Sequence, residues 1–223
     1  MPSLTVENYV KEIHRISSAE EGRPATTGQL AAALGVSPGT VTSMLKTLDA
    51  ARLATHRPYE GVALTKAGRI LALRVIRRHR LLELFLHRTL DMSWDEVHDE
   101  AEHMEHAVSD LLVDRIDAFL GHPLVDPHGD PIPPAGGVGE AERQRPVTAL
   151  AGCAVGARFR LARVVDQSNV FLRSLTDSGL SLGTEGQVER NPDGAGLMRV
   201  RLGDGRSLAL ALDTAGKLLV ESV

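Results

Sequence analysis

A mainly α-helical N-terminal part that contains a winged helix-turn-helix, followed by a small all-β barrel, is the fold class that the sequence predicts. Three observations lead to it. Apolar residues recur at helical spacing through the first half of the 223-residue chain, Pro and Gly gather in residues 121–146, and short β-leaning runs follow. The length suits two domains, and 43% hydrophobic with 24% charged residues is the composition of a globular protein.

The first 65 residues carry, in order, the elements of a winged helix-turn-helix. Apolar residues recur at intervals of three and four over Val6–Ser17, which predicts an amphipathic helix. Thr27 is a candidate cap for a short helix over Gly28–Leu34, and Ser37-Pro38 begins the next one. Leu53–Leu64 then holds two short extended runs around a Pro/Gly turn, which is the pattern of a β-hairpin wing.

The second short helix has an outer face suited to the major groove of DNA. Its apolar positions Val41, Leu45 and Leu48 are expected inside, whereas its outward side chains are short and polar. The candidate DNA contacts in the two short helices and the wing are Thr27, Ser37, Pro38, Thr40, Thr42, Ser43, Lys46 and Arg57. The alternative is a purely structural pair of helices, but the wing and the positive charge of this region favour DNA binding.

Two long helices, a linker and a β-domain are predicted for the rest of the chain. Thr65 is expected to cap a helix that ends at Leu90, and Ser93 to cap a single further helix that ends near Leu120. Residues 121–146 hold six of the eleven prolines, which indicates a linker. The β-leaning runs are Arg158–Val165, Val170–Leu175, Glu185–Glu189, Leu197–Leu202 and Ser207–Leu212. The predicted domains are the winged helix-turn-helix (1–75), a helical domain (76–140), a linker (141–150) and the β-domain (151–223).

Charge is distributed unevenly along the chain. The net charge of −4 divides into +6 for residues 1–80, −12 for residues 81–140 and +2 for residues 141–223. A basic first third suits a polyanion such as DNA, and an acidic middle suits a cation. The single cysteine, Cys153, excludes an intramolecular disulfide and any multi-cysteine metal site. Because no apolar run is long enough to span a membrane and the N-terminus lacks a signal core, a cytoplasmic protein without membrane association is expected.

Histidines and acids gather in the acidic middle, where seven of the nine histidines lie between positions 79 and 128. On one helix, His98, Glu102, Glu105 and His106 would share a face. That face continues as a mostly apolar stripe through Leu112, Ile116 and Phe119. Buried carboxylates are costly without a cation, and oxygen with imidazole donors suits Mn²⁺, Fe²⁺, Zn²⁺ or Co²⁺.

His79 and Glu83 lie one helical turn apart on the preceding helix and would meet His98 across the helix pair. The alternative for the whole group is a solvated acidic face with incidental histidines, and the alignment of the acids with the apolar stripe favours metal. The remaining histidines are expected to be surface or packing residues: His14, His56, His87, His122 and His128.

Taken with the winged helix, the spaced ligands and the segment Gly129-Asp130-Pro131-Ile132-Pro133 before a β-domain make the sequence resemble the DtxR/MntR family of metal-dependent transcriptional repressors. The resemblance covers nearly the whole chain. It implies a helical dimerisation domain and a C-terminal SH3-like (FeoA-like) domain. It also implies a homodimer, not an enzyme, which bound metal locks in the geometry that reads a palindromic operator in double-stranded DNA.

The resemblance further implies two metal sites. The primary site would use Asn8, Glu102, Glu105 and His106, and the ancillary site would use His79, Glu83 and His98 with Asp166 and Asn169 from the β-domain. Glu102 stands where iron-responsive members carry Cys and manganese-responsive members carry Glu, which favours Mn²⁺ over the alternatives Fe²⁺, Co²⁺ and Zn²⁺. Asn8 replaces a Met or Asp of the family, and Lys11 replaces a second acid of the manganese type. Separate primary and ancillary sites are therefore expected in place of a two-metal cluster.

Two other classes of function use the same residues. A small metallohydrolase would need an open coordination position and a general base, and the motif His-Glu-x-x-His is not present in the sequence. It would also leave the winged helix unexplained. A winged-helix regulator that does not respond to metal would bind DNA equally well in the presence of a chelator.

Overall fold

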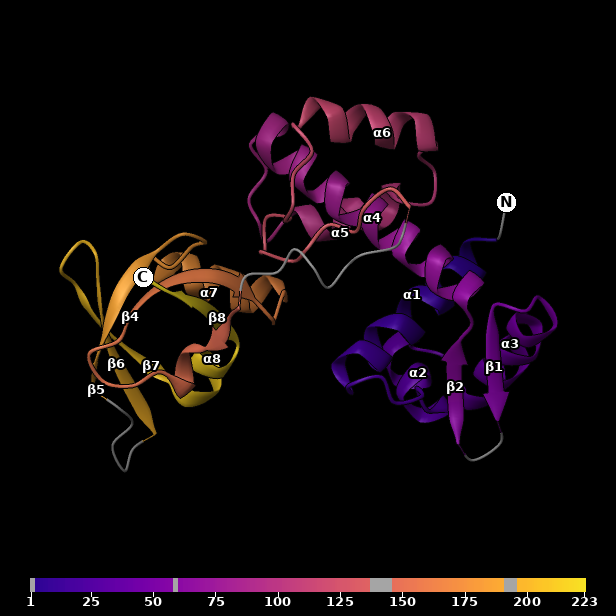
Figure 1. Ribbon diagram of the computed structural model, residues 1–223, viewed down its shortest axis with the longest axis horizontal. Coiled ribbons are helices and arrows are strands. Elements are labelled where there is room, and N and C mark those ends of the chain that lie inside the picture. The colour runs from indigo at the N-terminus through magenta and orange to yellow at the C-terminus, as the bar shows by residue number, and fades with distance from the viewer. Residues whose placement is uncertain (1–2, 58–59, 137–145, 191–195) are drawn as a thin grey trace. The chain divides into compact units, whose positions relative to one another are not determined.

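The computed structural model describes residues 3–57, 60–136, 146–190 and 196–223 (Figure 1). The chain forms two compact units: one from Met1–His79, Glu102–Asp110 and Pro133–Glu140, the other from Arg80–Ala101, Leu111–Ile132 and Ala141–Val223. The tip of the predicted wing and residues 141–145 of the predicted linker lie outside the described residues. Within the part of the chain that is described, no helix is long and apolar enough to cross a membrane.

The first unit contains the predicted winged helix-turn-helix. Its elements are α1 (Leu4–Ala19), α2 (Thr27–Leu34), α3 (Pro38–Ala50), β1 (Ala54–Arg57) and β2 (Gly61–Leu64). The two strands pair antiparallel next to the short helices, as Figure 1 shows. One apolar face of each helix, together with the hairpin, forms the core of this unit, which includes Val10, Ile13, Leu30, Leu45, Leu48 and Val62. The winged helix-turn-helix is therefore confirmed.

The start of α2 differs by one residue from the prediction. Thr26, not Thr27, is its cap: the Thr26 hydroxyl accepts a hydrogen bond from Gln29 N at 3.2 Å, and Thr26 N donates to Gln29 Oε1 at 2.8 Å. This is a reciprocal capping box, which satisfies two backbone donors at once. At the start of α3, Ser37 caps as predicted, because its hydroxyl accepts from Thr40 N at 3.1 Å.

Helix α4 (Lys66–Leu90) begins after Thr65, whose hydroxyl accepts a hydrogen bond from Gly68 N at 3.1 Å, as predicted. The single helix predicted from Ser93 to Leu120 is wrong. The structure has α5 (Val97–Met104) and α6 (Asp110–Phe119), with a turn between them. The break also ends the predicted apolar stripe, because Ile116 is buried whereas Phe119 is 70% exposed.

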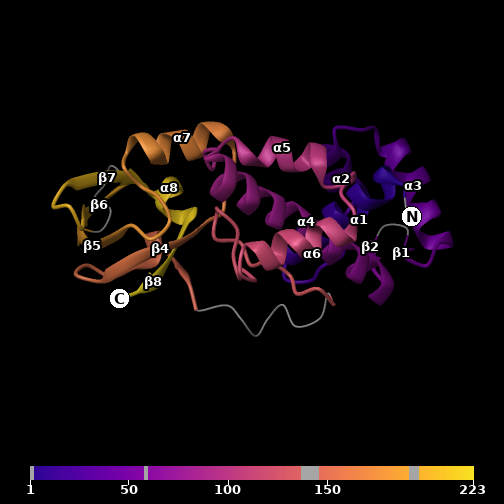
Figure 2. The same ribbon diagram turned by 90° about the horizontal axis from the view of Figure 1, so that it is seen from above.

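The β-domain contains one antiparallel sheet in the order β3-β8-β4-β5-β6-β7. The strands are β3 (Thr148–Ala149), β4 (Arg158–Val164), β5 (Glu185–Arg190), β6 (Leu197–Leu202), β7 (Ser207–Ala211) and β8 (Leu218–Ser222). Helices α7 (Asn169–Asp177) and α8 (Leu212–Gly216) lie beside the strands of this domain in Figure 2. They contribute Leu172, Leu175 and Ala215 to its hydrophobic core. The domain is not all-β, and its described strands do not pair into a closed barrel.

Helix α7 stands where the sequence predicted a strand over Val170–Leu175. Leu172 and Leu175 are buried three positions apart, whereas Val170 is 82% exposed. This is helical spacing. A run as short as Val170–Leu175 does not distinguish a helix from a strand by its apolar pattern alone.

Residues 126–130 are buried, although this segment was predicted to belong to a linker. The Asp126 carboxylate accepts hydrogen bonds from His128 N at 2.8 Å and Asp130 N at 2.9 Å, which folds the segment into a tight turn. Val164 N of β4 donates to His128 O at 2.9 Å. Gly129 has a φ of +85° and approaches the backbone of Ala162 so closely that a Cβ would overlap it.

Candidate metal centres and DNA-binding surface

The DNA-binding face predicted on α3 has the expected orientation. Val41, Leu45 and Leu48 are buried, and on the opposite side Ser37, Pro38, Thr40, Ser43 and Lys46 are exposed, with Thr42 half-buried. Thr27 is half-buried at the start of α2, and Arg57 of the wing is exposed beside Glu60, whose carboxylate lies 3.3 Å away. The short side chains leave the helix backbone accessible to a groove, and their contacts with DNA stay a prediction.

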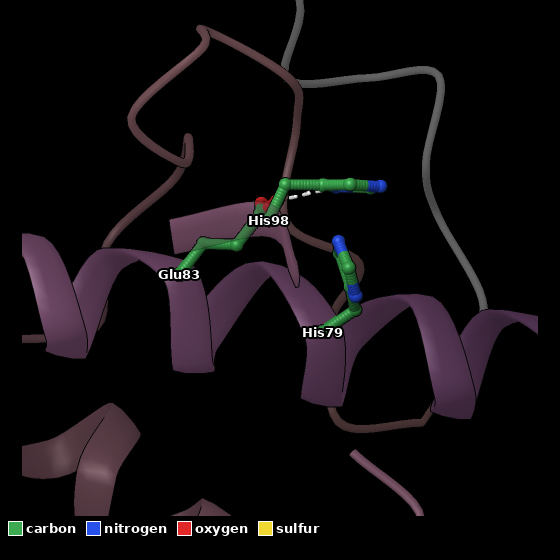
Figure 3. A group of neighbouring side chains, drawn as sticks. All are labelled: His79, Glu83 and His98. Carbon is green, nitrogen blue, oxygen red and sulfur yellow. Dashed lines mark hydrogen bonds and ion pairs between the residues drawn. The ribbon is translucent and has the colours of Figure 1, made fainter. Parts of the chain in front are cut away.

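His79, Glu83 and His98 come together on one side of α4. One ligand atom from each lies within 4.8 Å of the others. Figure 3 shows His98 beside Glu83, with His79 one turn along the helix. Glu83 Oε1 is 3.1 Å from His98 Nδ1, and the Glu83 side chain is 1% exposed. The structure thus brings together three of the predicted ancillary ligands.

A second group, here called the Asp126 cluster, consists of Glu83, Asp126 and His128, and sequence reasoning missed it. All three side chains are buried, and one ligand atom from each lies within 4.8 Å of the others. His128 Nδ1 is 3.7 Å from Glu83 Oε2 and 4.0 Å from Asp126 Oδ1. Glu83 therefore faces His98 with one carboxylate oxygen and His128 with the other.

The hydrogen bonding of His128 leaves one ring nitrogen directed at the two carboxylates. His128 Nε2 lies 2.7 Å from Trp94 O, and since a carbonyl only accepts, Nε2 carries the proton. In the neutral ring, Nδ1 then keeps its lone pair. That atom is buried and has no hydrogen-bond partner among the described residues. A backbone carbonyl that fixes the tautomer and orients the other nitrogen is the usual support of a metal-binding histidine.

The electrostatics of the Asp126 cluster indicate an excess of negative charge that Arg80 compensates only in part. Burial, together with the charges of Glu83 and Asp130, raises the pKa of Asp126 to about 7. Burial alone would lower the pKa of His128, but Glu83 and Asp126 outweigh it and raise that pKa above its ordinary value. Among the residues that the structure describes, Arg80 forms an ion pair with Asp126, with Nε 3.6 Å from Oδ2. Two carboxylates and a lone-pair imidazole fit a divalent cation here.

Three of the four residues predicted as the primary site, Glu102, Glu105 and His106, lie near one another, but beside a lysine, and Asn8 lies one helical turn from that lysine on α1. We call this group the Lys11 cluster: Asn8, Lys11, His79, Glu102, Glu105 and His106. Lys11 Nζ is 2.5 Å from Glu102 Oε1 and 2.9 Å from Glu105 Oε2. The turn between α5 and α6 turns Glu105 inward, where His79 Nδ1 lies 2.8 Å from Oε2. That these residues hold metal stays a prediction, and the lysine already neutralises their charge.

Glu105 is fully buried and yet ionised. Burial raises the pKa of its carboxyl, but the hydrogen bond with His79 and the charge of Lys11 outweigh burial and lower it below its ordinary value. The ring of His106 is held by Glu7, whose Oε2 lies 2.8 Å from Nδ1. His106 Nε2 lies 3.1 Å from Glu105 Oε1, at an angle that makes no hydrogen bond.

Asp166 and Asn169, predicted to complete the ancillary site, have other partners. Asp166 accepts hydrogen bonds from the backbone and hydroxyl of Ser168, and its Oδ2 is 3.3 Å from Lys217 Nζ. Burial is the largest single influence and raises the pKa of the Asp166 carboxyl, but the contacts with Ser168 and Lys217 together outweigh it and lower that pKa. Asn169 Nδ2 is 3.4 Å from Asp99 Oδ2. Among the described acids and histidines, Asp166 joins no group of three with ligand atoms this close.

Three family profiles match successive parts of the chain. The iron dependent repressor N-terminal DNA binding domain matches residues 1–62, the iron dependent repressor metal binding and dimerisation domain matches residues 65–134, and the FeoA domain matches residues 148–222. The first two profiles cover the winged helix, the Asp126 cluster and the Lys11 cluster. The third covers the sheet and its two helices.

Individual relatives agree with the profiles. The diphtheria toxin repressor of Corynebacterium glutamicum is 30% identical over 188 residues, 81% of this chain and 82% of that protein. The HTH-type transcriptional regulator MntR of Geobacillus kaustophilus is 35% identical over 116 residues, 52% of this chain and 80% of that protein. A solved structure described as "Manganese-dependent transcriptional repressor complex with manganese" has a TM-score of 0.87 and 38% identity, over 98% of this chain and 100% of that chain. The chain therefore belongs to the iron-dependent repressor family of metal-dependent, DNA-binding transcription regulators.

Proposed function

We propose that this protein is a homodimeric repressor that Mn²⁺ activates to bind a palindromic operator in genes of metal-ion homeostasis. Membership of the family makes it a DNA-binding regulator with a divalent metal cofactor, not an enzyme. The observation that carries the proposal further is the Asp126 cluster. It is a buried group of two carboxylates and an oriented imidazole, in the same chain as a winged helix with an exposed polar face.

The donor set favours Mn²⁺ over Fe²⁺. Glu83, Asp126, His98 and His128 offer carboxylate oxygen and imidazole nitrogen, and none of them is a thiolate. The one cysteine of the sequence, Cys153, belongs to the β-domain, and burial raises the pKa of its thiol, which disfavours the thiolate form that binds metals. Hard oxygen donors suit Mn²⁺, whereas thiolate ligands favour softer ions. Relatives described as iron-dependent and as manganese-dependent both exist, so Fe²⁺ is the second candidate.

Metal binding at the Asp126 cluster would fix the position of the turn after α6 on α4. When bound, the metal supplies two positive charges to a buried and otherwise repulsive pair of carboxylates. Glu83 belongs to α4, whereas Asp126 and His128 belong to the turn after α6, so holding all three fixes that turn to the helix. A ligand shifts a conformational equilibrium only by its differential affinity for the two states. The state in which the three side chains converge is then the one that metal favours.

The direct test is a selection of random-sequence DNA duplexes on the purified full chain, carried out without oxygen in Mn²⁺, in Fe²⁺ and in a chelator. The expected result is a palindrome recovered with Mn²⁺, weakly with Fe²⁺ and not with the chelator. Asp126→Asn and Glu83→Gln keep the side-chain shapes and should each weaken the Mn²⁺ dependence at least about tenfold. Glu100→Gln, at an exposed acid of α5, is the matched control. Recovery of the palindrome in chelator would refute metal control, and an unchanged response of Asp126→Asn would refute the site.

A further inference from the structure

The Lys11 cluster contains its own cation. Lys11 Nζ lies 2.5 Å from Glu102 Oε1, and 2.9 Å and 3.0 Å from the two oxygens of Glu105. The lysine side chain is 15% exposed and the Glu105 side chain is not exposed at all. Glu102 is 40% exposed, so the pair is buried on the Glu105 side only. An ammonium group that contacts both carboxylates occupies the position at which a divalent ion would neutralise them.

We propose that the Lys11 ammonium replaces a divalent metal in this cluster, so that α1 is joined to the turn after α5 without metal and the cluster binds none in the native chain. The inference rests on the proposed function in one respect: it leaves the Asp126 cluster, with His98, as the place where metal acts. Within the first unit, the contact between α1 and Glu105 is then permanent and does not depend on metal.

The surrounding charges support this assignment. Glu7, on the same helix as Lys11, lies 3.6 Å from Arg78 and 2.8 Å from His106 Nδ1, so its charge is also compensated. A divalent ion placed between Glu102 and Glu105 would lie against the ammonium and be repelled by it. The Lys11 cluster thus has the charge balance of a completed ion-pair network.

Two donor atoms remain that a metal would use if the ammonium were removed. Asn8 Oδ1 and His106 Nε2 are buried and have no hydrogen-bond partner among the described residues. Because Glu7 accepts the proton on His106 Nδ1, the neutral ring presents a lone pair at Nε2. With Glu102 and Glu105 these atoms make an oxygen and nitrogen donor set of the kind that Mn²⁺ accepts. Lys11 is therefore the residue that decides whether this cluster is a metal site.

The test counts Mn²⁺ per chain by equilibrium dialysis and elemental analysis, with the full-length protein. Lys11→Met removes the charge and keeps the length of the side chain, and Lys11→Arg keeps the charge as a matched control. Lys11→Met should bind one more equivalent of Mn²⁺ than the native chain, and Lys11→Arg should bind the same number. Adding His106→Ala to Lys11→Met should abolish the extra equivalent of bound Mn²⁺. His106→Ala in the native chain should leave the number of bound Mn²⁺ ions unchanged.

The same variants in an Asp126→Asn background separate this inference from the proposed function. In that background, the chain with native Lys11 should bind Mn²⁺ more weakly than the native protein does, and adding Lys11→Met should add one equivalent of bound Mn²⁺. The inference would be overturned if the Asp126→Asn variant, with its native Lys11, retained bound Mn²⁺ and then lost it when His106→Ala was added. A folded Lys11→Met chain, checked by circular dichroism, that binds no more Mn²⁺ than the native one would also overturn it. If Lys11→Met does not fold, Lys11→Gln carries the same expectation.

Discussion

Replacing Gly129 by Ala tests whether the turn that carries Asp126 and His128 is held against β4. Gly129 has a φ of +85°, and an added Cβ would overlap Ala162 O and lie 2.7 Å from Arg163 Cα. Gly156 has the same φ of +85°, and nothing lies within 4 Å of a Cβ added there. The left-handed conformation costs an L-residue about 1–2 kcal/mol at either position. The pair of variants therefore isolates the cost of the overlap.

At Gly129 the backbone must also move. Moving it breaks the hydrogen bond of 2.9 Å from Val164 N to His128 O, a loss of about 1 kcal/mol. Overpacking of a filled site adds about 1–3 kcal/mol. We expect Gly129→Ala to lower the free energy of unfolding by about 3–6 kcal/mol, and Gly156→Ala by about 1–2 kcal/mol.

The single tryptophan of the chain makes the assay direct. Trp94 is 8% exposed, its ring stacks on His128 with centroids 6.4 Å apart, and its carbonyl accepts from His128 Nε2. Its fluorescence should report both unfolding by urea and a Mn²⁺ titration. Gly129→Ala should also bind Mn²⁺ more weakly, because the turn positions two ligands. Equal loss of stability in the two variants, or an unchanged Mn²⁺ affinity in a destabilised Gly129→Ala, would refute the reasoning.

Two further predictions concern protonation and the helix-turn-helix. The pKa of Asp126 is raised to about 7 from an ordinary 3.8, so its protonation stabilises the metal-free fold below about pH 4, and that stabilisation is lost as the pH rises through 7. Over this pH range, the urea midpoint of the metal-free native chain should fall relative to that of Asp126→Asn. Parallel pH profiles of the two proteins would contradict the assignment. Thr26→Ala removes the cap of α2 and should lower the free energy of unfolding, measured by urea denaturation, by about 1 kcal/mol. Thr27→Ala, one residue later, should lower it clearly less. The reverse order would show that Thr27 is the cap.

Local signals account for most of the first unit and part of the second. The helices of the winged helix-turn-helix have caps, glycines and apolar spacing that act within a few residues, so the sequence predicts them closely. Helix α7 was mistaken for a strand because Val170–Leu175 is short and apolar, and only packing on the sheet distinguishes the two conformations. Directly after the end of α5 at Met104, Glu105 contacts Lys11 and His79, which are distant in sequence and which a pattern of local spacing does not reveal.

The candidate sites divide in the same way. His79 and Glu83 are one turn apart on a helix, so their convergence is a local property that the sequence predicts. Asp126 and His128 lie in a segment rich in Pro and Gly, which indicated a linker, and their burial results from the approach of Gly129 to the distant strand β4. The available signal for this site was the sequence Asp126-Pro127-His128-Gly129, in which a histidine between proline and glycine follows an aspartate by two residues. The sequence likewise identified Lys11 as a departure from the family but not as the partner of Glu102 and Glu105.

The two clusters stabilise buried acids by different means, and the pKa shifts distinguish them. At Glu105 the pKa falls despite complete burial, because Lys11 and His79 compensate its charge. At Asp126 burial and neighbouring acids raise the pKa, and the nearest guanidinium, that of Arg80, lies 3.6 Å away. A site whose acids are incompletely compensated gains more from an added cation than a completed ion-pair network does, and a larger gain makes a conformational equilibrium depend more strongly on metal. Hence the Asp126 cluster, where the negative charge is compensated less completely, is the one through which metal would regulate this repressor.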